Sequence, residues 1–152
     1  RPFFLRRSEL LDLYVIHVVK DVRQGVASSV KRDRGSASQM AKSWKRGNIA
    51  ASRAAKAVPA NRFLQINYHE FAAEPQKTVD QVSAFVGVNS APIPDDFFVP
   101  EHHIIGNRMR LKGEGGVIRN DEAWRTYLGP EDLESISKIA GSTNRSFGFD
   151  WP

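Results

Sequence analysis

Cysteine is absent from the 152-residue sequence, which excludes the disulfide-scaffold class of small proteins. Long apolar runs are also missing, because the longest, Leu13 to Val19, is interrupted by His17 and is too short to span a bilayer. Histidine is scarce, and Glu101-His102-His103 has no second ligand cluster at a suitable spacing, so we expect no metal site. What remains, 41% apolar and 26% charged residues, is typical of one globular domain.

Charge is distributed unevenly along the chain. The whole sequence carries a formal net charge of +5, but residues 1–62 hold fourteen Lys or Arg against four acidic residues. This first part therefore carries +10 and the remainder −5. A segment this basic indicates an anionic partner, and the candidates are nucleic acid, a membrane surface or a phosphorylated small molecule.

The spacing of apolar residues predicts alternating strands and helices. The β-branched run from Leu13 to Val19 is typical of a strand buried on both faces of a parallel sheet. Valines four residues apart from Val22 onward predict a helix that ends near Arg32. The later predicted elements are a helix over 36–58 with Gly47-Asn48 as a candidate interruption, a strand over 63–68, a helix from Pro75 to a stop at Gly87, and a helix from Pro130 to Ala140 stopped by Gly141.

This order of elements predicts an α/β fold: a three-layer α/β/α sandwich around a parallel sheet. Two strands are fewer than the roughly four to six of a usual sheet, so we expect the fold to be incomplete in this chain. The prolines at 92, 94 and 100 predict an extended linker, and a glycine-rich basic loop follows it.

Two cations at the end of the first strand stand where a ligand would be expected. Lys20 and Arg23 fall at the strand end and in the first turn of the next helix, where the helix dipole disfavours positive charge. A phosphate would balance them, and it could also bind the helix amides and the hydroxyl of Ser28. The alternative is that Asp21 caps the helix while the cations and serines are solvated surface residues.

A family resemblance begins at these residues. The segment Lys20-Asp21-Val22-Arg23, followed by Ser28, resembles the 3′-phosphate-binding segment of sulfotransferases that use 3′-phosphoadenosine 5′-phosphosulfate. That segment usually reads Arg-Asp-Pro-Arg, with a serine eight residues after the first arginine. The resemblance implies that Lys20, Arg23 and Ser28 bind the 3′-phosphate. Lysine in place of the first arginine keeps the charge but loses the two-pronged contact, and Val22 replaces the proline.

Two later stretches continue the resemblance in the family's order. Residues 65–88, with an aromatic at Tyr68 and a Phe-Val-Gly-Val helix end, are similar to the family's Tyr-Glu-Asp-Leu segment and the helix after it. The resemblance implies that Tyr68 lies against the adenine, whereas the alternative is a core aromatic. Residues 103–128 resemble the Gly-Asn-X-X-Arg loop and tryptophan segment of carbohydrate-type and bacterial members. Here the cofactor-binding candidates are Arg108, Arg110 and Arg119, and the alternative is a solvated basic loop.

The resemblance covers residues 13–128 and implies the C-terminal portion of a sulfotransferase domain with a P-loop nucleotide-hydrolase-like fold. Residues 1–152 are then one domain, with an α/β portion over 13–87, a basic cofactor-covering region over 88–128, and a C-terminal helix and tail over 129–152. The family's loop for the 5′-phosphosulfate and its catalytic His or Glu have no counterpart in this sequence. We therefore expect this chain alone to be inactive as a transferase.

The implied reaction transfers a sulfuryl group from 3′-phosphoadenosine 5′-phosphosulfate to a hydroxyl or amine acceptor and leaves adenosine 3′,5′-bisphosphate, without a metal. The expected partners are the nucleotide donor and an acceptor, with no nucleic acid and no transmembrane segment. The alternative is a non-enzymatic basic domain that binds RNA or another polyanion. It predicts aromatic residues interleaved with cations on an exposed face, but apart from Trp44 the aromatics lie mostly in apolar stripes.

Overall fold

The computed structural model describes residues 11–95, 120 and 122–151 of the chain. Strands and helices alternate at first, and helices alone follow. The strands and α-helices are β1 (Val15–Val19), α2 (Val22–Val30), α3 (Ala37–Ala55), β2 (Phe63–Asn67), α4 (Tyr68–Ala73), α5 (Pro75–Val86), α7 (Trp124–Tyr127) and α8 (Pro130–Ser146), and a short 3-10 helix, η1 (Ala60–Arg62), precedes β2.

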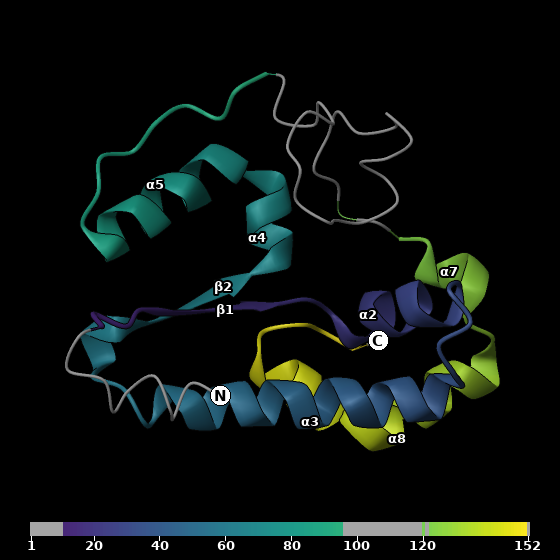
Figure 1. The fold of residues 1–152 in the computed structure, drawn as a ribbon. Helices are drawn as coiled ribbons and strands as arrows, with labels where there is room; N and C mark the ends of the chain where they lie inside the picture. The colour runs from purple at the N-terminus through teal and green to yellow at the C-terminus, as the bar shows by residue number, and fades with distance from the viewer. Residues whose placement is uncertain (1–10, 96–119, 121, 152) are drawn as a thin grey trace.

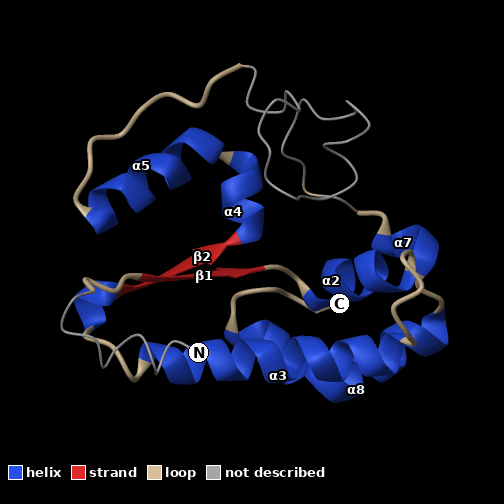
Figure 2. Cartoon of the chain, in the orientation of Figure 1, coloured by secondary structure: helices blue, strands red, loops and turns tan. Residues whose placement is uncertain are grey.

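The two strands form a parallel pair in the middle of the molecule. Their register runs from Val15 opposite Phe63 to Val19 opposite Asn67, so both strands end at the same edge. Helices α3 and α8 lie on one side of the pair, and α4 and α5 lie on the other (Figures 1 and 2). The predicted three-layer α/β/α arrangement around a parallel sheet is therefore confirmed.

Strand β1 is not buried on both faces, so that prediction was wrong. Val19 is only 1% exposed, whereas Ile16 and Val18, which point to the opposite face, are 40% and 52% exposed. On that face α5 contacts the chain just before β1, where the Tyr14 and Phe85 rings lie 5.3 Å apart. No element of the described residues buries Ile16 and Val18, although β-branched residues favour the strand itself.

Helices α2 and α3 both begin at a side-chain cap, Asp21 for α2 and Ser36 for α3. The candidate interruption of α3 was wrong, because the helix runs unbroken through Gly47. Inside the helix the Asn48 side chain donates to the carbonyl of Trp44 at 2.9 Å. Within the described part of the chain, no helix has the combination of length and apolarity that crossing a membrane requires.

A short helix that the apolar pattern did not predict follows β2 at once. The strand was expected to include Tyr68, but it ends at Asn67, whose Oδ1 accepts a hydrogen bond from the His69 amide at 2.8 Å. This cap begins α4, so Tyr68 is the first residue of a helix at the carboxyl end of the strand. Helix α5 begins at Pro75 and ends at Gly87, as predicted.

Helix α8 is longer than predicted. It continues past Ala140 to Ser146, so Gly141 lies inside the helix and does not end it. The buried face consists of Ile136, Ala140, Gly141 and Asn144. The apolar pattern stopped early because glycine and asparagine occupy the last two of these buried positions.

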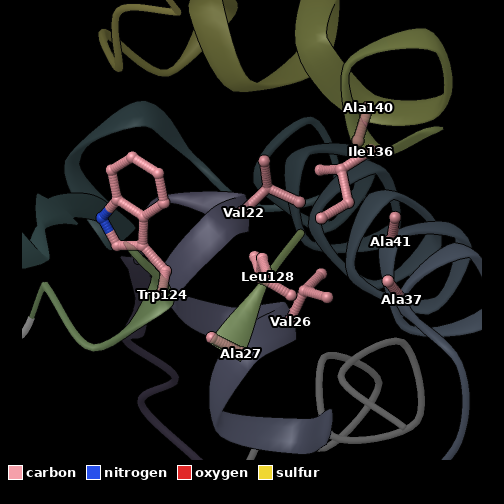
Figure 3. Packing of buried hydrophobic residues seen from close by; sticks show 9 residues of the cluster. All are labelled: Val22, Val26, Ala27, Ala37, Ala41, Trp124, Leu128, Ile136 and Ala140. Atoms are coloured by element: carbon pink, nitrogen blue, oxygen red, sulfur yellow. The ribbon is translucent and has the colours of Figure 1, made fainter. Parts of the chain in front are cut away.

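One buried apolar cluster joins α2, α3, α7 and α8 (Figure 3). Its fully or nearly buried members are Val22, Val26, Ala27, Ala37, Ala41, Trp124, Leu128, Ile136 and Ala140. Only two residues separate the end of β1 from the start of α2, so this cluster also fixes the position of the strand's carboxyl end.

Two glycines give a matched test of the helix assignments. Gly87 ends α5 at φ +78°, a left-handed conformation, so Gly87→Ala should lower the free energy of unfolding by about 1 kcal/mol. Gly47 lies inside α3 with open space around the position of a Cβ atom, so Gly47→Ala should raise the free energy of unfolding by about 0.5–1 kcal/mol. Urea unfolding of both variants measures the two shifts, and shifts of the same sign would contradict the assignments.

Candidate functional site

The carboxyl ends of β1 and β2 bring a cation and an aromatic ring together. Lys20 follows β1, Tyr68 follows β2, and the paired residues Val19 and Asn67 directly precede them. The Nζ atom of Lys20 lies 4.3 Å from the centroid of the Tyr68 ring. The structure thus brings these two predicted residues together at the end of the strands where open α/β sheets bind ligands.

Arg23 lies beside them, held by groups from three parts of the chain. Its Nε and Nη2 atoms donate to both carboxylate oxygens of Asp21 at 2.6–3.2 Å, and Nη2 also donates to the Asp150 carbonyl at 2.9 Å. The guanidinium lies 4.7 Å from the Trp124 ring centroid and 5.0 Å from that of Trp151. The Asp21 side chain is 1% exposed and that of Arg23 is 13% exposed. Arg23 is thus a fixed and largely neutralised cation.

The first amides of α2 are already bonded within the protein. The Asp21 carboxylate accepts from the Arg23 amide at 2.7 Å, and the buried Asn144 Oδ1 accepts from the Val22 amide at 2.9 Å. These two bonds commit the Val22 and Arg23 amides, so a phosphate would have to displace them in order to bind these donors. Asp21 caps the helix, as the alternative interpretation held. An anion at this edge would therefore be bound mainly by side chains.

Comparison with protein families supplies the deciding observation. The model of the sulfotransferase family matches residues 12–92, more than half of the chain, and this range contains both strands, Lys20, Arg23 and Tyr68. The chain belongs to the sulfotransferase family. The resemblance drawn from the sequence is confirmed.

Two solved structures have the same fold. The sulfotransferase domain from the Synechococcus PCC 7002 olefin synthase aligns with a TM-score of 0.70 at 21% identity, over 100% of this chain and 56% of that one. The sulfotransferase domain from the curacin biosynthetic pathway aligns with a TM-score of 0.63 at 18% identity, over 100% of this chain and 60% of that one. This sulfotransferase-family chain thus spans somewhat more than half of either domain. No curated protein matches it.

Ser28 lies further along the chain from the strand end than Lys20 and Arg23 do. It follows the cap of α2 by seven positions, about 10 Å along a helix axis. Its hydroxyl accepts a hydrogen bond from Nη2 of Arg32, and its carbonyl accepts one from Nε of the same residue at 2.7 Å. Arg32, near which the helix was predicted to end, thus places a cation beside the Ser28 hydroxyl in this sulfotransferase-family chain.

The remaining predicted residues, Arg108, Arg110 and Arg119, lie outside the described residues, as does the Glu101-His102-His103 stretch. Asn120 accepts a hydrogen bond from Nε2 of the buried Gln24 on α2 at 2.6 Å. In the part of the chain that the structure describes, no group of three or more His, Cys, Asp or Glu could hold a metal ion.

The C-terminal tail contributes to this region in a way that the sequence did not predict. Phe147, Phe149 and Trp151 alternate along the tail. Phe147 contacts the rings of His17 and Trp44, Phe149 contacts His69, and Trp151 lies over Arg23. This alternation of aromatic residues was the available signal, but the tail is too short to read as a strand.

His69 is a further residue at this edge that the sequence did not single out. Its ring lies 5.0 Å from that of Phe149, and its Nε2 atom is buried with no hydrogen-bond partner among the described residues. Burial lowers the pKa of His69 below its ordinary value of 6.5. The charge of Asp21 opposes this shift, and those of Lys20 and Arg23 add to it.

The lowered pKa of His69 predicts a loss of stability in acid. Below about pH 6.5 the His69 imidazole binds a proton in the unfolded chain more readily than in the folded chain. The free energy of unfolding should therefore fall between pH 7 and pH 5. The His69→Phe variant cannot titrate there and should lose less stability over the same interval. Urea unfolding at a series of pH values checks this, and parallel profiles for the two proteins would exclude His69 as the cause.

Proposed function

We propose that the edge formed by Lys20, Arg23 and Tyr68 binds the adenosine 3′-phosphate end of 3′-phosphoadenosine 5′-phosphosulfate. The protein would act in sulfuryl transfer to a hydroxyl or amine acceptor. The observation that carries this proposal is the convergence of Lys20 and Tyr68, 48 positions apart in the sequence, at the carboxyl ends of two parallel strands.

The residues at this edge suit the nucleotide. The Lys20 ammonium supplies a compact positive charge for a phosphate, and the adjacent half-buried Tyr68 ring supplies an aromatic face for the adenine. Since Asp21 largely neutralises Arg23, Lys20 should carry most of the charge attraction.

These residues act by binding and orientation. The donor would supply a sulfuryl group. The bond from sulfur to the bridging phosphate oxygen would break, the acceptor oxygen or nitrogen would bond to sulfur and give up its proton to a base, and adenosine 3′,5′-bisphosphate would leave. Holding the nucleotide at its 3′-phosphate fixes the direction of that bond relative to the sheet, which is the usual contribution of protein positioning to group transfer. The proposed nucleotide contacts also include Ser28, which Arg32 joins, and the three arginines Arg108, Arg110 and Arg119.

The alternative, a domain that binds RNA or another polyanion, predicts an exposed aromatic face, but the three tryptophans, all within the described residues, do not form one. Trp44 is packed against the buried cluster, and its Nε1 donates to the Lys20 carbonyl at 3.0 Å. Trp124 is buried and Trp151 lies against Arg23. In the described part of the chain the tryptophans thus support the strand ends and offer no stacking platform. We therefore propose a nucleotide partner and no nucleic acid.

Thermal unfolding with three ligands tests the proposal. Adenosine 3′,5′-bisphosphate at 100 times its dissociation constant should stabilise the chain by about 2.7 kcal/mol, whereas AMP, which lacks the 3′-phosphate, should stabilise it less at the same concentration. A short single-stranded RNA oligonucleotide should have no larger effect than AMP. Stabilisation by the oligonucleotide alone would contradict the proposed function and favour the polyanion alternative.

A further inference from the structure

The C-terminal tail is anchored to the start of α2. Figure 1 shows the C-terminus beside this helix. Asn144, fully buried in α8, accepts from the Val22 amide and donates from Nδ2 to the Phe149 carbonyl at 3.4 Å. Phe149 is itself 3% exposed and lies against His69. The tail is therefore a packed part of the molecule, with its backbone and rings held from two sides.

This anchoring places the Asp150 carbonyl and the Trp151 ring against the guanidinium of Arg23. The Asp150 carbonyl and the Asp21 carboxylate accept from the Nε and Nη2 edge of the guanidinium, while Trp151 and Trp124 lie near the guanidinium group. Among the described residues no hydrogen bond uses Nη1. The guanidinium thus has its orientation fixed by the protein and one nitrogen left for a ligand.

We propose that Trp151 is a positioning residue for the nucleotide, and this inference rests on the proposed function. Trp151 holds the Arg23 guanidinium so that Nη1 donates to the 3′-phosphate beside Lys20. Because the tail already orders the long Arg23 side chain, less conformational entropy would be lost when the ligand binds. The aromatic ring also keeps water from the guanidinium, which strengthens the remaining hydrogen bond.

Trp151→Ala and Trp151→Phe test this role through phosphate discrimination. The ratio of the dissociation constant for AMP to that for adenosine 3′,5′-bisphosphate is measured by calorimetry on the whole 152-residue chain. Trp151→Ala should lower the ratio roughly three- to tenfold, the value of about one hydrogen bond, and Trp151→Phe should keep it near that of the wild type. Tyr127→Ala removes an exposed aromatic ring that lies over Lys31 and is the matched control.

The ratio separates positioning from a purely structural role. If Trp151 only stabilised the fold, Trp151→Ala would lower the melting temperature or weaken both nucleotides equally, and an unchanged ratio would overturn the inference. Equal affinity of the wild-type chain for the two nucleotides would instead contradict the proposed function, and the inference would fall with it.

Discussion

The Asn144→Leu variant is expected to melt on the order of 10 °C below the wild-type chain. Asn144 is fully buried and joins α8 to the Val22 amide and the Phe149 carbonyl. Leucine would leave both backbone groups without these partners, and each unsatisfied group lowers the free energy of unfolding by about 1–3 kcal/mol. A loss of about 2–5 kcal/mol is a large part of the roughly 5–15 kcal/mol that holds a domain folded, and it lowers the melting temperature accordingly.

Ser142→Leu is the matched control for this variant. Ser142 is exposed on the same helix, so the same leucine side chain is added there without loss of a buried hydrogen bond. Its melting temperature should stay within a few degrees of that of the wild type, as surface substitutions usually do. Calorimetry compares the three proteins. Equal melting temperatures for Asn144→Leu and Ser142→Leu would show that the link from α8 to α2 contributes little.

Replacing Lys20 by alanine is expected to weaken adenosine 3′,5′-bisphosphate binding by about 10- to 100-fold. The proposed contact is a charge-assisted hydrogen bond to phosphate, worth about 1.5–3 kcal/mol, and Asp21 already offsets the charge of Arg23. Binding of AMP should change little, because AMP lacks the phosphate at this position. Titration calorimetry measures both affinities.

Two further variants sharpen the Lys20 experiment. Lys20→Arg restores a cation with a planar fork suited to phosphate, so it should retain the affinity for adenosine 3′,5′-bisphosphate. Lys77→Ala removes a cation from α5 that is paired with Glu74 on the surface, and it should leave the affinity unchanged. If Lys20→Ala and Lys77→Ala had the same effect, Lys20 would not be the phosphate ligand.

The sequence predicted the elements whose burial follows a regular period. The β-branched run of β1, the valines of α2 and the proline-to-glycine limits of α5 each carry a local signal, and the structure has these elements where they were expected. The parallel pairing followed from the alternation of strands and helices, and it places Lys20 and Tyr68 at one edge.

The features that the sequence did not predict depend on contacts between distant residues. Gly141 and Asn144 lie on the buried face of α8, but neither residue type marks a core position. Trp151 contacts Arg23 across 128 positions, and this contact requires the tail to return to α2. The exposure of Ile16 and Val18 also depends on which elements surround the sheet, and their side chains do not encode it.

The three tryptophans allow the proposed nucleotide site to be tested directly. Trp44 donates from its indole to the Lys20 carbonyl, and Trp124 and Trp151 lie over Arg23. A ¹H–¹⁵N correlation spectrum therefore contains three indole signals that report on this edge. On titration with adenosine 3′,5′-bisphosphate we expect these signals and the Lys20 and Tyr68 amides to shift, by more than AMP shifts them. Saturable shifts confined to other residues, with all three indole signals unmoved, would contradict a nucleotide site at the carboxyl ends of β1 and β2.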